Sequence, residues 1–322
     1  MTRAGVLRLS RFAVAAVLAA SFAPLPSAAQ STAPQILIAA TPNDSGGTPF
    51  YALDLGNFKK AGLDVKVQPV ENPGNMVAAV IGGSATFGTL TIPGIALARE
   101  KGVPIVIVAP TSIYNSATPT SGIIVLKSSP IKKASDLNGK TVATRDISNL
   151  SYFGANNWID KNGGDSKSVK WVEINDTQTV PAMIAGRVDA ASVSEPAFDD
   201  AIHGPNARML APIYDAIGDK FLIGAIFTTE EYAKAHPDIV RKFSQVIIDT
   251  AIWANRNRPL SAKILEKYAG VPVPPGTTRV AYAERIRPAD AQPVLDMLKQ
   301  YGALKSSLRA SDLFAVQIAT TP

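Results

Sequence analysis

Short apolar segments alternate with helix-like segments from Ile36 onward, and this alternation limits the possible folds more than any other feature of the sequence. Apolar runs at 36–40, 65–70, 85–88 and 104–109 have the length of buried strands. Segments with helical signals separate them, at 49–60, 75–81 and 91–101. Such alternation is typical of βα units that build a mostly parallel sheet. We therefore predict an α/β fold.

The same pattern is repeated further along the chain, which indicates a second lobe. Strands are predicted at 122–126, 141–144, 169–174 and 190–193, with helices near 149–161, 179–185 and 195–202. The apolar run 221–228 is expected to return the chain to the first lobe. After it we expect only helices, the clearest of which begins near Pro237.

These patterns predict a division of the chain into four parts. Residues 1–29 form a signal peptide, 30–118 the first part of lobe 1, 119–215 lobe 2, and 216–322 the return to lobe 1 with extra C-terminal helices. Each lobe is expected to hold a mostly parallel sheet flanked by helices. The crossings between the lobes are expected near 118–122 and 211–221.

The N-terminus has the layout of a cleavable secretory signal. Arg3, Arg8 and Arg11 precede the uncharged apolar run 12–23, and the small residues 27–29 follow it. The apolar run is shorter than the roughly 20 residues that a membrane-spanning helix needs, and prolines interrupt the chain after it. We predict export to the periplasm.

Composition narrows the function classes. The chain has no cysteine, so we expect core packing rather than disulfides to stabilise the exported protein, and no N-terminal cysteine can carry a lipid. The formal net charge is +6, and the predicted signal contains three arginines and no acidic residue. No dense Lys/Arg patch with interleaved aromatics is present, so we expect no nucleic-acid partner.

The sequence also lacks the residues that most enzymes need. Its two histidines are His203, in a His-Gly-Pro-Asn turn, and His236, before Pro237, and neither is placed like a catalytic base. No zinc-binding, phosphate-loop or dinucleotide motif occurs. An all-carboxylate metal site stays open, although no acidic run indicates one. We expect no catalytic residue, no cofactor and no metal.

Several strings resemble a known family. They are Ile-Leu-Ile-Ala at 36–39, the stretch from Pro49 to Val65 that contains Phe-Lys-Lys-Ala-Gly-Leu, Ala-Ser-Asp-Leu-Asn-Gly-Lys at 134–140, Met-Ile-Ala-Gly-Arg-Val-Asp-Ala at 183–190 and Ser-Glu-Pro at 194–196. In this order and spacing they resemble the nitrate, sulfonate and taurine group of periplasmic binding proteins of ABC importers.

The likeness extends from Ile36 to about Gly270 and has one departure. The family usually has an acidic residue before the Phe-Gly of its third strand, whereas this chain has Ala85-Thr86 there. The resemblance implies a type II periplasmic binding protein fold, whose two lobes close by a hinge around a small molecule. It also implies delivery to a membrane permease driven by a separate ATPase, and we expect a monomer. The role of 271–322 stays open.

Candidate ligand contacts lie where strands lead into helix N-termini. In open α/β sheets ligands collect at the carboxyl ends of strands, and helix N-termini offer free N–H groups and a positive dipole end to an anion. Four segments qualify, at 41–50, 89–91, 112–115 and 145–152. The candidates in them are Thr41, Asn43, Asp44, Thr48, Phe50, Thr89, Leu90, Thr91, Tyr114, Asn115, Arg145, Asp146, Ser148, Asn149 and Tyr152.

Glu195 is a further candidate, because it follows an apolar strand and precedes Pro196. A ligand that contacts Glu195 would offer a donor such as an amine, a hydroxyl or a ring N–H. A glutamate at this place can instead be an ordinary first-turn residue that favours the helix dipole. Aromatic walls of the cleft are predicted from Tyr114, Tyr152, Phe198 and Phe221, each of which has a core position as its alternative.

The polar candidates have structural alternatives too. The glycines of the loop 41–48 can serve only to turn the chain, and Thr91 can act only as a helix N-cap. Asn149 can likewise cap a helix, and Arg145 and Asp146 can pair with each other at the surface. We predict ligand contact for each of these segments while keeping these alternatives open.

The mix of hydroxyls, aromatic rings and carboxylates favours an organic ligand over an inorganic ion. The resemblance allows sulfonates, taurine, nitrate, aromatic carboxylates, and flavin or thiamine precursors. An alternative function is a nitrate or other inorganic-anion binding protein. Another is an enzyme of the pyrimidine-precursor synthesis type on the same fold, although such enzymes rely on histidine and cysteine-rich segments that this chain lacks.

Overall fold

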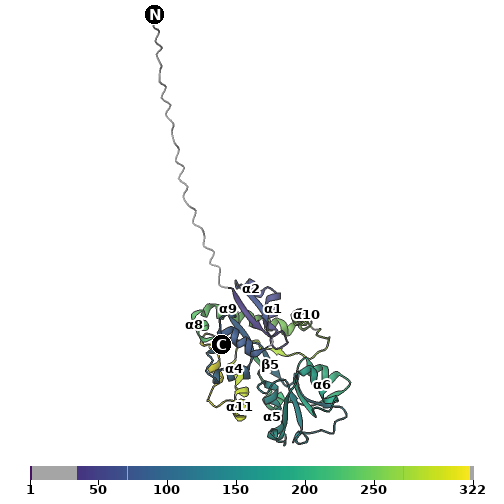
Figure 1. Ribbon diagram of the computed structural model, residues 1–322. Coiled ribbons are helices and arrows are strands. Elements are labelled where there is room, and N and C mark those ends of the chain that lie inside the picture. Colours follow the sequence, from purple (N-terminus) through teal and green to yellow (C-terminus); the bar gives the residue numbers. More distant parts are fainter. Residues whose placement is uncertain (2–34, 71, 271, 320–322) are drawn as a thin grey trace. The chain divides into compact units, whose positions relative to one another are not determined.

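The computed structural model of the chain describes residue 1 and residues 35–70, 72–270 and 272–319 (Figure 1). The chain divides into two units, 1–32 and 33–322, and the second contains all the helices and strands that the structure describes. The predicted signal peptide at 1–29 lies, apart from Met1, outside the described residues. No helix in the described part combines the length and apolar character that crossing a membrane would need.

The first of two five-stranded sheets has the strand order β2-β1-β3-β12-β4. Its strands are β1 (Ile36–Ala40), β2 (Val65–Pro69), β3 (Phe87–Thr91), β4 (Ile105–Pro110) and β12 (Gly224–Thr229). β1 pairs in parallel with β2 and β3, and β12 runs antiparallel between β3 and β4. Every residue of β4 is buried, as expected for a strand covered on both faces.

The second sheet has the order β10-β6-β9-β7-β8. Its strands are β6 (Ser121–Leu126), β7 (Thr141–Thr144), β8 (Lys170–Glu173), β9 (Ala190–Ser194) and β10 (Ala207–Pro212). β7 is parallel to β8 and β9, whereas β6 is antiparallel to β9 and β10. The predicted α/β fold with two mostly parallel sheets is confirmed, but β10 was not foreseen from the sequence.

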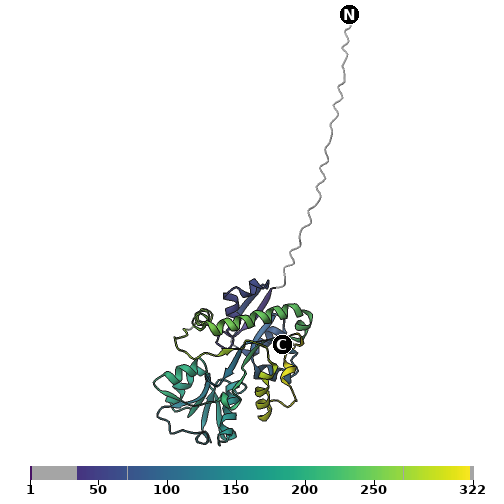
Figure 2. The ribbon, with the colours of Figure 1, turned by 180° about the vertical axis from the view of Figure 1, so that it is seen from behind.

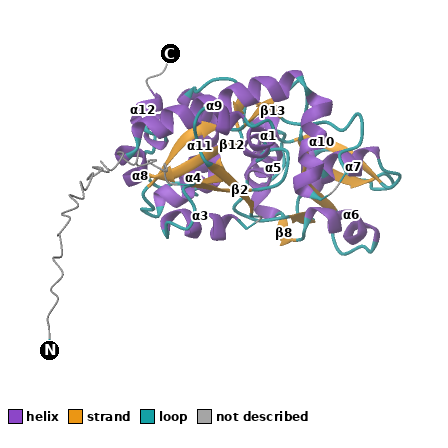
Figure 3. Ribbon diagram, turned by 90° about the horizontal axis from the view of Figure 1, so that it is seen from above, coloured by secondary structure: helices purple, strands orange, loops and turns teal. Residues whose placement is uncertain are grey.

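Helices flank both sheets (Figure 3). Those attached to the first sheet before the chain leaves it are α1 (Thr48–Asp54), α2 (Asn57–Lys60), α3 (Pro73–Ile81) and α4 (Ile92–Glu100). α1 and α2 were predicted as one helix. Gly56 separates them because its φ of 67° lies in the left-handed region, which a right-handed helix does not continue through.

The remaining helices follow in chain order. The second sheet carries α5 (Leu150–Lys161), α6 (Asp176–Ile184) and α7 (Ala197–His203). After β12 come α8 (Glu230–Ala235), α9 (Pro237–Arg256), α10 (Arg258–Ala269), α11 (Gln292–Gln300) and α12 (Val316–Ala319). Short 3₁₀ helices occur at Ala134–Leu137, Ser166–Ser168, Tyr214–Ala216, Pro288–Ala291 and Ala310–Leu313.

The C-terminal helices belong to the first sheet. α9, the long green helix in Figure 2, packs its apolar stripe against that sheet. Its Phe243 ring stacks on Phe87 of β3, with ring centroids 4.1 Å apart, and on Phe58 of α2. Figure 1 shows α11 beside α4. The core of this half therefore joins segments from both ends of the described chain.

A third, three-stranded sheet joins the two segments that connect the large sheets, which we call the passages. Its order is β11-β5-β13, with β5 (Ser112–Asn115), β11 (Lys220–Leu222) and β13 (Ala281–Tyr282). β5 follows β4 on the way to the second sheet, and β11 precedes β12 on the way back. The strand predicted over 221–228 is therefore two strands, each pairing in a different sheet.

β13 corrects a second expectation, because only helices were predicted after the return to the first lobe. Its two residues pair with Ile113 and Ser112 of β5. Two residues contain no periodicity that distinguishes a strand from a loop, so this pairing depends on where the rest of the chain has brought β5.

Candidate functional site

A cavity of about 460 Å³ is lined by residues that belong to both five-stranded sheets and the segments attached to them. Strands, helices and loops of the first sheet supply most of its wall, and loops at the ends of β7 and β8 supply the rest. The lining residues are Thr41, Asn43, Ser45, Gly46, Asn72, Met76, Thr89, Leu90, Thr91, Gly94, Thr111 and Gly224 from the first group, and Arg145, Asp146, Ser148, Asn149 and Asn175 from the second.

A smaller cavity of about 90 Å³ adjoins it. The two share Asn43, Ser45, Thr91, Arg145 and Asn149, and we call them together the cleft. The smaller cavity is also lined by Thr120, Leu150, Ser151, Asp176, Ser194, Glu195, Tyr214 and Ile223. Its wall therefore includes two acidic side chains and several hydroxyls.

The cleft is bordered by helix N-termini that carry their own capping residues. Thr91 Oγ1 accepts from the Gly94 N–H at the start of α4. Asn149 Oδ1 accepts from the Tyr152 N–H at the start of α5, at 2.8 Å. A helix N-terminus presents the positive end of the helix dipole. Capping and cleft lining thus occur in the same residues, and the borders favour a negatively charged ligand group.

Asn149→Ala is expected to destabilise the protein by about 1 kcal/mol, because the Tyr152 N–H loses its acceptor. The measurement is urea denaturation of the ligand-free protein. Asn149→Asp is the matched control, since aspartate caps helices about as well as asparagine. If Asn149→Ala and Asn149→Asp lowered the free energy of unfolding equally, the N-cap hydrogen bond would contribute nothing to stability.

The loop 41–47 closes on itself at the edge of the cleft. Asn43 Oδ1 accepts from the Gly46 N–H at 2.9 Å, and the Thr41 N–H donates to Thr89 Oγ1 at 3.0 Å. A Cβ at position 46 would lie 2.4 Å from the carbonyl oxygen of Thr41, so only glycine fits there. The glycine is thus required for the turn itself, while Asn43 and Ser45 line the cleft.

Glu195 lies at the inner end of the cleft. Its Oε1 atom is buried and accepts no well-formed hydrogen bond from the described residues; the Thr120 hydroxyl beside the same cavity makes none either, although it interacts weakly with the Glu195 carboxyl and opposes the rise of its pKa. Burial, followed by the negative charge of Asp44, holds the pKa of the Glu195 carboxyl well above its usual value. An unsatisfied buried carboxyl oxygen is costly, so this site is suited to a ligand that donates a hydrogen bond.

Three further ionisable side chains line the cleft. Burial raises the pKa of the Asp176 carboxyl to about 6, although the charge of Arg145 opposes this shift. Asp146 Oδ1 accepts from both the N–H and the hydroxyl of Ser148, at 2.6 Å each. Asp146 therefore shapes its own loop, and Arg145 is exposed at the cleft.

Ten of the predicted contact residues line the cleft. They are Thr41, Asn43, Thr89, Leu90, Thr91, Arg145, Asp146, Ser148, Asn149 and Glu195. Their role in binding stays a prediction. They share a position at strand ends or helix starts, which is why the sequence pattern could find them.

The other predicted contacts lie elsewhere. Phe50 packs against Tyr268, Phe198 is in the core of the second sheet, and Thr48 is fully buried. Tyr152 packs on Phe153 and Trp171. An aromatic residue near a strand end can point toward the core or toward the cleft. At these positions the side chain buries more apolar area in the core.

The segment 112–115, predicted as a ligand loop, is strand β5. The Tyr114 and Phe221 rings pack against each other in the core, tilted by 31° and with centroids 5.1 Å apart. Asn115 lines a separate cavity of about 400 Å³ beside the three-stranded sheet. Backbone pairing with β11 and β13 turns these side chains away from the cleft.

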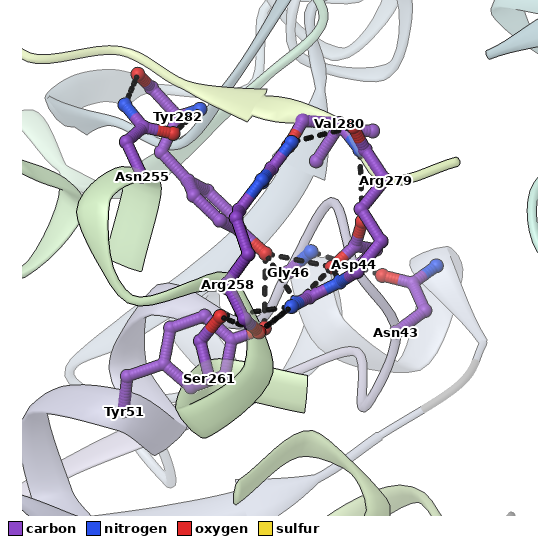
Figure 4. Close-up of polar contacts among 10 residues, drawn as sticks. All are labelled: Asn43, Asp44, Gly46, Tyr51, Asn255, Arg258, Ser261, Arg279, Val280 and Tyr282. Carbon is purple, nitrogen blue, oxygen red and sulfur yellow. Dashed lines mark hydrogen bonds and ion pairs between the residues drawn. The ribbon is translucent and has the colours of Figure 1, made fainter. Parts of the chain in front are cut away.

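Asp44 is also turned away from the cleft and lies in a buried polar cluster (Figure 4). Its carboxylate accepts from the Arg279 guanidinium and from the Tyr282 hydroxyl. Arg279 was not singled out from the sequence, because it lies in the C-terminal stretch for which no pattern offered a role.

Several residues that line the cleft were not predicted from the sequence, although some of them have a recognisable sequence signal. Asn72 accepts from the Asn75 N–H and caps α3, and Asn175 precedes Asp176 at the start of α6, so both have N-cap signatures. Thr111 of the larger cavity and Thr120 of the smaller cavity had no such signature. Their position depends on how the two passages between the sheets are packed.

A family sequence model matches this chain, and solved structures share its fold. The sequence model of the family described as NMT1/THI5 like matches residues 47–259. No curated protein matches the chain. Among solved structures, the periplasmic aliphatic sulphonate binding protein SsuA from Escherichia coli has a TM-score of 0.73 at 18% identity, covering 89% of this chain and 99% of that chain.

Two further structures are similar. The alkanesulfonate-binding protein SsuA from Xanthomonas axonopodis pv. citri, bound to MOPS, has a TM-score of 0.69 at 17% identity, covering 87% of this chain and 97% of that chain. The ligand binding component of an ABC-type import system from Staphylococcus aureus, with zinc bound, has a TM-score of 0.72 at 15% identity, covering 88% and 97%. At these identities the likeness concerns the fold.

Proposed function

Because the chain belongs to the NMT1/THI5-like family, we propose that it is the periplasmic substrate-binding component of an ABC-type importer. The two-sheet fold that it shares with binding proteins supports this role. So does a cleft that is lined by hydroxyls, amides and helix N-termini from both sheets. The partners would be a small-molecule ligand, a membrane permease and a separate ATPase, and the binding protein itself would act as a monomer.

The proposed mechanism is closure of one lobe on the other around the ligand. Ligand first contacts the loops of one sheet, and closure then adds contacts from the other sheet and excludes water. The passages that contain β5 and β11 are the segments that would absorb the backbone change, since they connect the two sheets. The closed form would be the one that the permease recognises.

The observation that carries the proposed ligand class is the buried Glu195 Oε1 atom, which accepts no well-formed hydrogen bond from the described residues of the cleft. A ligand with an N–H donor would satisfy it, and an anionic group on the same ligand would suit Arg145 and the N-termini of α4 and α5. We therefore propose a small zwitterionic or N–H-bearing organic solute. Taurine, an aminosulfonate, and an aminopyrimidine vitamin precursor with an acidic group fit this description.

A thermal-shift screen of the mature chain tests the proposal. The compounds are taurine, an alkanesulfonate without an amine, an aromatic carboxylate, an aminopyrimidine and nitrate. A ligand present at about 100 times its Kd is expected to stabilise the protein by about 2.7 kcal/mol. We expect a compound with an N–H donor to give the largest shift.

Two outcomes would contradict the proposal. Stabilisation by nitrate alone would favour the inorganic-anion alternative over an organic ligand. Mass spectrometry of the stabilising compound after incubation separates binding from catalysis, because a binding protein returns it unchanged. Conversion of the compound would instead favour the enzyme alternative on the same fold.

A further inference from the structure

The segment Thr278–Ala283, which we call the strap, lies beyond residues 47–259 that match the family. It contacts three parts of the molecule in succession. The Thr278 N–H donates to Asp199 Oδ1 of α7 at 3.1 Å. Residues 281 and 282 form β13 against β5, and the Ala283 N–H donates to the carbonyl of Thr111, which lines the cleft.

Arg279 is the centre of the strap and is only 7% exposed. Its Nε and Nη2 atoms donate to Asp44 Oδ1 at 2.9 and 2.5 Å. Nη1 donates to the carbonyl of Arg258 and to Ser261 Oγ at the start of α10, at 2.9 and 2.8 Å. The guanidinium thus links Asp44 to a helix that does not line the cleft.

Asp44 is held from every side by this cluster (Figure 4). Its Oδ1 atom also accepts from the Tyr282 hydroxyl at 2.7 Å, and its Oδ2 atom accepts from the Val280 N–H at 2.8 Å. The Tyr51 hydroxyl receives a bond from Arg279 Nη2 at 2.8 Å. The carboxylate therefore cannot turn without breaking bonds to the strap.

The loop that contains Asp44 forms one wall of the cleft. Asn43 and Ser45, the residues on either side of Asp44, both line it. Because the side chain between them is fixed, the backbone of both neighbours is fixed as well. We infer that the strap fixes the conformation of the loop 41–47 and that Arg279 is the residue that positions this loop. Only the statement that the loop contacts a ligand rests on the proposed function.

The same contact acts on the inner end of the cleft. The negative charge of Asp44 raises the pKa of Glu195, second to burial as a cause. Arg279 supplies the positive charge that accompanies Asp44, so removing it exposes Glu195 to a more negative neighbour. Arg279 thus influences the cleft through loop geometry and through charge, without touching a ligand itself.

The test compares Arg279→Gln and Arg279→Lys with Arg285→Gln, an exposed position in the same C-terminal stretch. Hydrogen exchange of the ligand-free protein is followed at the Thr41, Gly46 and Gly47 amides, which all donate within the loop or to Thr89. In Arg279→Gln we expect exchange at these amides to be at least about tenfold faster, with the amides of β7 and β9 unchanged. Arg285→Gln should leave all of them unchanged.

Lysine should restore only part of the protection, because an ammonium keeps the charge but cannot span Asp44 and Ser261 as the planar guanidinium does. With the compound that stabilises the wild type, we expect Arg279→Gln to raise Kd by about tenfold, because a loop 41–47 that is no longer fixed would lose about one of its hydrogen bonds to the ligand. We also expect the pH dependence of its affinity to move to higher pH, which loss of stability alone would not cause.

If Arg279→Gln does not fold, Tyr282→Phe replaces it, since this change removes one bond to Asp44 and keeps the ring. Faster loop exchange in it supports the inference. Unchanged loop exchange in a folded Arg279→Gln or Tyr282→Phe protein overturns it. The exchange measurement needs no ligand. Failure to find any ligand for the wild type would therefore count against the proposed function, whereas the exchange rates would still test the role of the strap.

Discussion

Glu195→Gln is expected to weaken binding of an N–H-bearing ligand by about 10-fold to 150-fold, which corresponds to the roughly 1.5–3 kcal/mol of a hydrogen bond to a charged group. The reason is that the carboxyl oxygen in the cleft accepts no well-formed hydrogen bond from the described residues, and the amide that replaces it carries no charge. Isothermal titration with the compound selected by the thermal-shift screen measures the change. Glu231→Gln, an exposed glutamate of α8, is the control.

The same substitution is expected to stabilise the ligand-free protein at neutral pH. The folded pKa of Glu195 is raised, so the protonated form favours folding, and stability is lost as pH rises from the ordinary pKa of about 4.5 towards the folded value. Glutamine is neutral at every pH and removes this loss. Thermal denaturation of both proteins between about pH 4 and about pH 8 measures the difference. Weaker binding without any gain in stability would contradict the conclusion that burial of the Glu195 carboxylate destabilises the ligand-free protein at neutral pH.

Ligand binding by the wild type should also release a proton when the ligand is cationic. Glu195 must ionise to form a charge-assisted bond, so affinity rises with pH until the ligand loses its own proton. Titrations in two buffers of different ionisation enthalpy detect the released proton. A binding enthalpy that is the same in both buffers would contradict the release and indicate that the carboxyl group keeps its protonation state on binding.

Arg279→Met is expected to destabilise the protein by about 3–5 kcal/mol, because it leaves the Asp44 carboxylate buried without its cation. Adding Asp44→Asn removes that charge and keeps one carbonyl oxygen to accept from the Val280 N–H, while the amide NH2 can donate to the Tyr282 hydroxyl, so the double variant should recover part of the loss. Urea denaturation of the two single variants and the double variant measures the coupling between the residues.

The control for this pair is Arg287→Met. Arg287 forms an ion pair with Asp290 at 3.7 Å, but its side chain is 47% exposed, so its loss should cost at most about 1 kcal/mol. If Arg279→Met were no more destabilising than Arg287→Met, the buried pair would not stabilise the fold. If the double variant were as unstable as the sum of the single variants, the two side chains would act independently.

The part of the site that the sequence predicted consists of residues whose roles are local. Thr91 and Asn149 were recognised as polar residues ahead of helices, and both cap a helix and line the cleft. Glu195 was recognised from the end of an apolar strand followed by proline. Each of these signals involves a few neighbouring residues, where hydrogen bonds and backbone preferences act directly.

The aromatic residues show where this reasoning stops. Tyr114 and Phe221 were predicted as cleft walls, yet they are more than a hundred positions apart in sequence and pack against each other in the core, because β5 and β11 pair there. Which face of a short strand is buried depends on the elements packed against it. No local pattern at either residue contains that information.

By itself the sequence determined the two α/β sheets, the helix starts that border the cleft and the position of Glu195, because periodicity and capping are properties of adjacent residues. Only the tertiary structure decided that 112–115 is a strand, that 281–282 extends its sheet and that Arg279 meets Asp44 across 235 positions. A buried charge is stable only beside its partner, and the partner is chosen by how the whole chain closes.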